Sequence, residues 1–329
     1  MPEAPQVVPP LKLDGKRRPL LYSTLTAYFQ LEELEPNDEA RLEQANAIVA
    51  DWFGGKLRWT GASVTETVEP FSLTDFELIS CHVRNLEVWS PEANDDSDAR
   101  AFDYDHDVAA IDEYEVALHA GVYAGEASPW SYRFFSVVRP YSEHRGARLR
   151  TISMLKLTVP DSEPLDGFTA RVRDIAGALR LRWASAGLGF AGWERLQYVE
   201  TFKAMYVHAR RHPGYDVDDY FRTVDNWHDK VRSVNWLTIV GPELRRRLQL
   251  DHAGEIVFNI KEVSSVELGE NLAFLAGGAP VAGDRNHRIV PEEYREVDRI
   301  IRPVRATESR NFSPPWDDHT TREWLTRFE

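Results

Sequence analysis

The sequence predicts an α+β fold in which antiparallel or mixed sheets pack against helices. Strand-like runs rich in β-branched and aromatic residues follow one another without the regular strand–helix alternation of a doubly wound sheet. Helical patterns stand apart from these runs and are bounded by Asn, Pro or Gly. Hydrophobic residues make up 43% of the 329 residues and include 10 Trp, 12 Tyr and 15 Phe, which is enough apolar material for a large core.

The first elements are an arm, a strand, a helix and a second strand. Residues 1–18 are rich in proline and end in Lys-Arg-Arg, so we expect a flexible N-terminal arm. Residues 20–31 are rich in Tyr, Phe and Thr and predict a strand. Residues 37–53 predict a helix that an Asn caps and two glycines end. A further strand is expected over 56–64.

The middle of the chain predicts more strands and one helix. Turn signals separate three strand-like runs, at 114–123, 130–138 and 149–159. A helix follows over 165–181 and leads into a second Leu-Arg-Trp strand. The order strand, helix, Leu-Arg-Trp strand therefore occurs twice, over 20–64 and 149–190, which we interpret as a candidate internal duplication.

The remaining third alternates short strands with helices. A long helix over 193–211 is stopped by His-Pro-Gly. Shorter elements follow, with strands at 234–240, 256–260, 264–268 and 272–276 and helices at 243–248 and 291–301. After the arm, we expect an α+β domain over 19–305, made of two halves that meet near residue 145. A C-terminal tail over 306–329 carries a terminal helix near Trp324.

Charge and cysteine content exclude several classes of function. The net charge of −14 disfavours direct binding to nucleic acid, because an acidic surface repels phosphate. It favours a basic protein partner, although moderate acidity also keeps a cytoplasmic protein in solution. The single cysteine, Cys81, excludes an internal disulfide and a thiolate-rich metal site. Since nothing resembles a signal peptide or approaches the ~20 apolar residues of a membrane span, we expect a cytoplasmic protein without membrane contact.

Two motifs are better explained by packing than by ligand binding. Residues 187–192 match G-x-G-x-x-G, but no acidic residue follows at the spacing that binds a ribose, so we expect a tight glycine-rich corner. His208 and His212 have the i, i+4 spacing of a helical zinc site, but two arginines stand between them. We therefore expect no metal site and no cofactor.

Negative charge is concentrated in residues 92–115, which we call the acidic segment. It contains ten Asp or Glu residues and one Arg, and so carries −9 of the net −14. Such clustering costs self-repulsion, which favours a docking surface for a basic protein, with aromatic side chains as anchors. The residues that we expect to contact a partner are Asp95, Asp96, Asp98, Phe102, Asp103, Tyr104, Asp105, Asp107, Asp112, Glu113 and Glu115.

Alternatives for the acidic segment stay open at this point. One is a solvated loop without a partner. Another is a metal-dependent hydrolase that uses the carboxylates of Asp103–Asp107. Weak binding of calcium or magnesium is a third, although Val108 and Tyr114 occupy the positions of the glycine and the bidentate glutamate of a calcium loop. Because no Ser, His or Lys pattern anchors a catalytic pair, we favour a protein without catalytic residues.

Three blocks in the second half of the chain carry a family resemblance. They are HPGYDV at 212–217, VNWLTIVGP at 234–242, and AGGAPVAGDRN at 276–286 followed by Tyr-Arg. In order and spacing they resemble blocks of the type VI secretion system immunity proteins that accompany VRR-Nuc nuclease effectors. The resemblance is clear over residues 185–305.

The resemblance implies a protein that binds and neutralises a cognate secreted toxin of the DNase type. Such a protein would cover the toxin's basic DNA-binding face, in agreement with the acidic segment. Immunity to a toxin that is not a nuclease is the alternative on the same scaffold, and oligomeric state is not predicted. We expect structural roles for the family-motif residues Pro213, Gly214, Asp216, Asn235, Trp236, Gly277, Pro280, Gly283, Asp284, Asn286 and Tyr294.

Overall fold

The computed structural model describes most of the chain outside the acidic segment. The described residues are 11–12, 19–62, 68–84, 113–121, 126–141, 148–192, 198–217, 219, 223, 229–250, 256–307 and 311–329. Of the acidic segment, only 113–115 are included. The partner contacts predicted between Asp95 and Asp112, and nearly all of the N-terminal arm, therefore lie outside the described residues.

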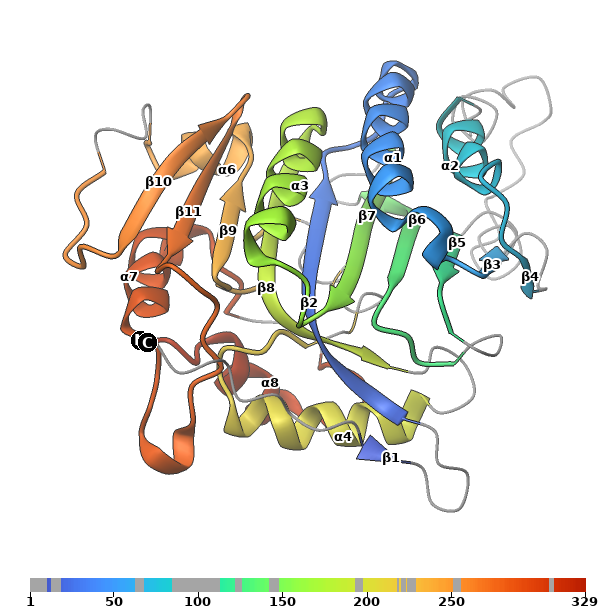
Figure 1. Cartoon of the computed structure of the whole chain (residues 1–329). Coiled ribbons are helices and arrows are strands. Elements are labelled where there is room, and N and C mark those ends of the chain that lie inside the picture. The colour runs from blue at the N-terminus through green and yellow to red at the C-terminus, as the bar shows by residue number, and fades with distance from the viewer. Residues whose placement is uncertain are drawn as a thin grey trace.

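A sheet of 11 strands runs through the described molecule (Figure 1). From edge to edge its strands are β10 (Val263–Leu268), β11 (Asn271–Ala276), β9 (Leu237–Val240), β8 (Leu181–Gly192), β2 (Pro19–Leu31), β7 (Arg148–Pro160), β6 (Ser131–Tyr141), β5 (Glu113–His119), β3 (Trp59–Ala62) and β4 (Val68–Pro70). The short β1 (Leu11–Lys12) pairs with β2. Every pair of these strands is antiparallel, so the predicted α+β class is confirmed.

The central strand β2 joins the two halves of the chain. It pairs with β7 on one side and β8 on the other, and Ala27, Tyr28 and Phe29 are fully buried. Aromatic and β-branched residues favour such a strand because they pack well on a pleated surface. The sheet is therefore continuous across the expected boundary near residue 145. The domain division and the internal duplication stay predictions.

Helices α1 (Glu39–Phe53), α2 (Asp75–Arg84) and α3 (Leu165–Ala178) lie side by side against the sheet, with α1 in the middle (Figure 1). α1 buries one stripe, which consists of Leu42, Ala45, Val49 and Phe53. Such spacing is the signature of a helix with one core-facing side. α1 ends at Gly54, whose φ of +44° is a conformation that glycine adopts without strain.

The other helices cover the C-terminal half. α4 (Tyr198–Arg211) crosses the ends of β2 and β8, α6 (Pro242–Arg247) packs against β8 and β11, and α7 (Glu292–Ile301) packs against β11 and β10. α8 (Asp318–Leu325) begins with a capping box between Asp317 and Thr320. The expected C-terminal tail contributes core side chains, because Phe312 packs on Trp316 and Trp324 with ring centroids 5.2 and 5.3 Å away.

Three local expectations are wrong. Residues 256–260 form no strand, because the backbone N–H of Asn259 donates to Glu296 of α7 (2.6 Å). The glycine-rich run 187–192 is no corner, since it continues β8. Glycine is needed there for close packing: a Cβ at Gly189 would lie 2.5 Å from Thr26 Oγ1 of the neighbouring strand.

The third wrong expectation is the strand over 234–240, because Asn235 and Trp236 precede β9 instead of lying on it. The Asn235 side-chain oxygen accepts from the Trp236 backbone N–H (2.8 Å). The Asn235 backbone N–H donates to Thr238 Oγ1 (3.1 Å). These bonds replace the strand ladder locally.

Candidate functional site

The first and third family-motif blocks lie side by side. The backbone N–H of Gly214 donates to the carbonyl of Ala282 (2.8 Å), and His212 Nδ1 lies 2.7 Å from the carbonyl oxygen of Gly283. The end of α4 joins them, because Arg211 Nη2 donates to Asp284 Oδ2 (2.9 Å). Hydrogen bonds from Arg211 hold the pKa of Asp284 well below its usual range.

Both glycines at this contact are required by space or conformation. A Cβ on Gly214 would lie 1.8 Å from the carbonyl oxygen of Val281. Gly283 has a φ of +68°, and a Cβ there would lie 2.7 Å from the carbonyl oxygen of Ile289. Asp284 then accepts from the backbone N–H of Asn286 (2.9 Å), which closes the turn. The close approach of the two blocks therefore depends on the absence of side chains.

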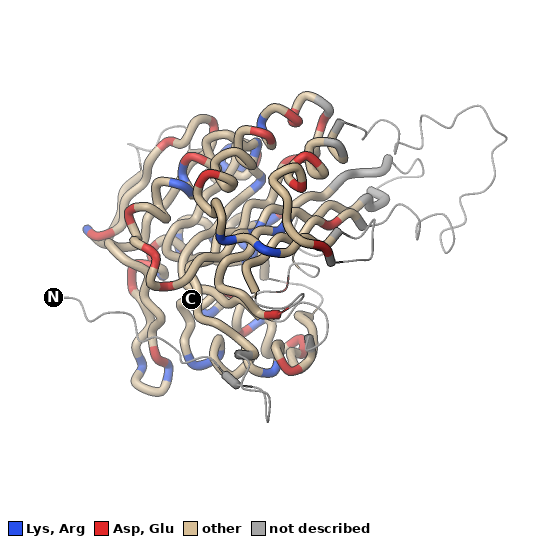
Figure 2. The backbone as a smooth tube through the Cα atoms, turned by 45° about the vertical axis from the view of Figure 1, so that its right-hand side comes forward, with Lys and Arg blue, Asp and Glu red and all other residues tan. Residues whose placement is uncertain are grey.

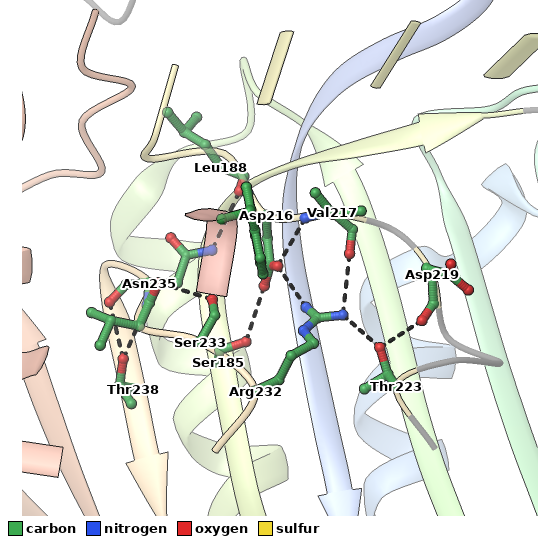
Figure 3. A network of polar contacts seen from close by, with 12 residues as sticks. Ser185, Leu188, Asp216, Val217, Asp219, Thr223, Arg232, Ser233, Asn235 and Thr238 are labelled. Carbon is green, nitrogen blue, oxygen red and sulfur yellow. Dashed lines mark hydrogen bonds and ion pairs between the residues drawn. The ribbon is translucent and has the colours of Figure 1, made fainter. Parts of the chain in front are cut away.

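A fully buried ion pair joins Asp216 of the first block to Arg232 (Figure 3). Arg232 Nη2 is 2.6 Å from Asp216 Oδ1, and both side chains have 0% exposure. Asp216 also accepts from Ser185 Oγ (3.3 Å) and from the backbone N–H of Val217 (2.8 Å). Arg232 donates to Thr223 Oγ1 (2.8 Å) and lies 4.4 Å from the Tyr28 ring centroid. Both charges are therefore satisfied inside the core.

The second block is tied to the same network (Figure 3). Asn235 Nδ2 donates to the carbonyl of Leu188 (3.3 Å), which also accepts from the backbone N–H of Asp216 (2.9 Å). Trp236 Nε1 donates to the carbonyl of Gly277 in the third block (2.9 Å). Tyr294, whose hydroxyl pKa burial raises, accepts from the backbone N–H of Val281 (3.2 Å). The three blocks thus form one hydrogen-bonded unit.

The C-terminal residues close this unit. Arg327 donates from Nε to the carbonyl of Pro213 (2.6 Å) and from Nη2 to the carbonyl of Val234 (3.1 Å). Its guanidinium lies 3.7 Å from the Trp324 ring centroid. Burial lowers the pKa of Arg327 to about 9, so the group stays charged at neutral pH. Another buried arginine, Arg305, binds Asp298 and Glu329.

The chemistry of these groups is structural. Among the described residues, no cluster of three or more His, Cys, Asp or Glu side chains could hold a metal ion. His212 contacts the Gly283 carbonyl, and burial lowers the pKa of its neighbour His208. The carboxylates of the unit bind arginines and backbone N–H groups, and in addition Asp216 accepts from the Ser185 hydroxyl and Asp284 contacts the His287 ring. The arrangement holds segments together and presents no nucleophile–base pair.

The described residues of the acidic segment, 113–115, begin β5 and contact α2. Tyr114 stacks on His82 with ring centroids 4.0 Å apart, and its hydroxyl donates to the carbonyl of Leu78 (2.6 Å). Burial lowers the pKa of His82 to about 4, so this ring is neutral at pH 7. Glu115 lies in β5 with 15% side-chain exposure, 3.1 Å from Arg133 Nε. Glu115 therefore has a charged neighbour within the sheet, and Glu113 begins the same strand.

Sequence reasoning missed the arginines that complete the network. Arg232 lies 16 residues after Asp216, and Arg327 reaches the first block from a distant part of the chain. The only signal was a charged residue within an aromatic and aliphatic neighbourhood, as in VRSVNWL and WLTRFE. Long-range ion pairs leave no spacing pattern, so that signal identifies candidates and not partners.

The comparisons with known proteins identify the family. A family model described as type VI immunity for VRR-NUC matches residues 80–328, which is well over half of the chain. The chain belongs to the TsiV family. The family resemblance deduced from the three blocks is thereby confirmed, and the matched range also includes the acidic segment and the C-terminal residues.

A structural neighbour agrees with the assignment. The Pseudomonas aeruginosa T6SS protein PA0821 superimposes with a TM-score of 0.71 at 15% sequence identity, over 94% of this chain and 83% of that one. At this identity the likeness shows a shared fold. None of the curated proteins matches the sequence.

TsiV membership establishes the role and the partner. The chain provides type VI immunity against a VRR-Nuc effector, and its partner is the cognate secreted nuclease. This assignment does not favour the metal-dependent hydrolase at Asp103–Asp107, whose residues lie outside the described chain. In the described part of the chain, no helix has both the length and the apolar character that a bilayer span requires.

Proposed function

We propose that this TsiV protein neutralises its VRR-Nuc effector by direct, non-catalytic binding that blocks access of DNA to the nuclease. The observation that carries the proposal is the buried motif network around Asp216 and Arg232. Its two buried charges pair with each other and make further hydrogen bonds to protein groups, as expected of a scaffold that presents a surface. We place this binding in the cytoplasm, where an incoming nuclease would reach chromosomal DNA.

Charge supports occlusion of the DNA-binding face. A nuclease must attract a phosphate backbone, so its DNA-binding face is basic. The acidic segment supplies −9 of this chain's net −14. Outside that segment, acidic and basic residues are interspersed along the described backbone (Figure 2). The region best able to compete with DNA for a basic face is therefore the acidic segment and its surroundings.

A competition measurement tests this proposal. The cognate VRR-Nuc nuclease is immobilised without its metal, and association of the purified TsiV protein is followed with and without duplex DNA. We expect DNA to slow association in proportion to its occupancy of the nuclease. Binding that is indifferent to saturating DNA would contradict occlusion of the DNA-binding face.

A further inference from the structure

Seven large apolar side chains are exposed in the described part of the chain. Val257 stands alone, and the other six fall into two groups. The first group is on α2 and the turn that begins it, where Leu73 is 65% and Leu78 is 38% exposed. The second group is on α4 and the turn that Gly283 closes, and consists of Val199, Val207, Val281 and Ile289. Either group offers apolar side chains that a partner could bury as an anchor.

Charge separates the two surfaces. β4 and α2 together carry three acids, Glu69, Asp75 and Glu77, against one basic residue, Arg84. α4 carries Lys203, Arg210 and Arg211 against a single acid, Glu200. A DNA-binding face is basic, so the acids of β4 and α2 attract it, whereas the cations of α4 pair with Glu200, Glu323 and Asp284 and leave no excess of negative charge there. Charge complementarity with a nuclease therefore selects α2.

The sheet holds α2 firmly in place. Phe76, Ile79 and Val83 are buried, and the ring of Phe76 packs against Tyr132 with centroids 5.5 Å apart. Tyr114 fixes the middle of the helix through its bond to the Leu78 carbonyl. Because the helix is already ordered, binding to it loses little conformational entropy, which favours tight association. Leu73 and Leu78 are 65% and 38% exposed, so we expect their truncation to destabilise the fold less than truncation of Phe76, Ile79 or Val83.

We propose that the exposed face of α2, with Leu73 and Leu78 as apolar anchors and Glu77 beside them, docks onto the basic DNA-binding surface of the cognate VRR-Nuc nuclease. This inference rests on the proposed function. Exposed Leu73 lies in the turn before α2, and exposed Glu77 and Leu78 are consecutive residues of the helix, so apolar and acidic contacts are presented by one short segment. Apolar anchors govern the dissociation rate of such complexes, whereas surrounding charge governs association.

The experiment compares two pairs of substitutions that truncate exposed apolar side chains to alanine. Leu73→Ala/Leu78→Ala removes the proposed anchors, and Val199→Ala/Val207→Ala removes the exposed apolar groups of α4 as a matched control. Binding to the purified nuclease is measured by surface kinetics, and folding is checked by thermal unfolding. We expect the α2 pair to raise Kd by about 30-fold or more, mostly through faster dissociation, and the α4 pair to change it by less than about 3-fold.

The outcomes separate this inference from the proposed function. If the wild-type protein does not bind the nuclease, the proposed function fails. If the wild type binds and the folded α2 pair binds equally well, only the α2 surface is wrong. Loss of binding in the α4 pair alone would move the interface to α4. A change in the oligomeric state of the α2 pair in light scattering would show that a second copy of this chain covers the leucines, which also overturns the inference.

Discussion

Removal of one charge from the buried Asp216–Arg232 pair tests whether the family-motif unit is scaffold. In Asp216→Ala the Arg232 guanidinium keeps its bonds to the Val217 carbonyl and Thr223 but loses its counterion, at 0% exposure. Breaking a buried pair in this way costs about 3–5 kcal/mol. Ser185 Oγ and the Val217 N–H also lose an acceptor, at about 1 kcal/mol each. We therefore expect the free energy of unfolding to fall by at least about 3 kcal/mol.

Urea unfolding followed by tryptophan fluorescence measures this loss. With a slope near the upper end of the usual range, about 3 kcal/mol per M, the midpoint should fall by about 1 M. The double variant Asp216→Leu/Arg232→Met removes both charges and should recover most of the stability, because no unpaired charge remains in the core. A midpoint shift below about 0.3 M in the single variant would refute this view of the pair.

Nuclease binding by the same variant separates scaffold from interface. Asp216 lies 0% exposed, so it cannot contact a partner in the native structure. At a temperature where Asp216→Ala remains folded, we expect its affinity for the nuclease to match that of the wild type. A folded variant with strongly reduced affinity would mean that the first block takes part in recognition.

Three further perturbations have defined outcomes. Gly214→Ala forces a Cβ to within 1.8 Å of the Val281 carbonyl oxygen and should lower the melting temperature markedly, whereas Gly55→Ala, with no atom within 4 Å, should not; equal effects would contradict the close-approach argument. The Arg299 hydrogen bonds lower the pKa of Glu296 to about 2, so its contribution is present above its unfolded pKa of about 4.3 and is lost as pH falls towards 2. The stability difference between wild type and Glu296→Gln, followed by thermal unfolding, should therefore shrink over that range; a difference independent of pH would contradict the pairing. Substitution of Asp103, Asp105 and Asp107 by Lys should slow nuclease association and weaken its salt dependence. Unchanged association kinetics in this triple variant would remove the acidic segment from the mechanism.

The elements that local patterns determine were predictable. The strand over 20–31 and the helices over 37–53 and 291–301 follow from periodicity and end signals, and the structure has them as β2, α1 and α7. The strand order was not predictable, because β2 lies between β7 and β8, which follow it by more than a hundred residues. Pairing at that distance depends on tertiary packing and leaves no local signal.

The errors concern segments whose structure depends on contacts with distant parts of the chain. The apolar run at 256–260 resembles a strand, but α7 satisfies its Asn259 backbone through Glu296. Helix α2 escaped prediction, and its place on the sheet depends on contacts such as Phe76 with Tyr132. The residues after 306 are polar in sequence, yet Phe312 and Trp324 bury their rings in the core.

The candidate site was only partly predictable for a related reason. The family-motif residues were identified from block spacing, but the groups that neutralise and clamp them, Arg232 and Arg327, lie far away in sequence. The contact residues predicted between Asp95 and Asp112 lie outside the described chain and stay predictions. The α2 surface was not predictable from the sequence, because the exposure of its leucines depends on how the helix packs on the sheet.

The most direct test of neutralisation by binding is the stoichiometry of inhibition. DNA cleavage by the VRR-Nuc nuclease, with its metal present and at a concentration well above Kd, is measured against increasing amounts of the TsiV protein. Direct binding predicts a linear fall in activity that ends sharply at a fixed molar ratio of the two proteins, with both recovered intact. Progressive inactivation by a small fraction of an equivalent would show catalysis instead and would contradict the account.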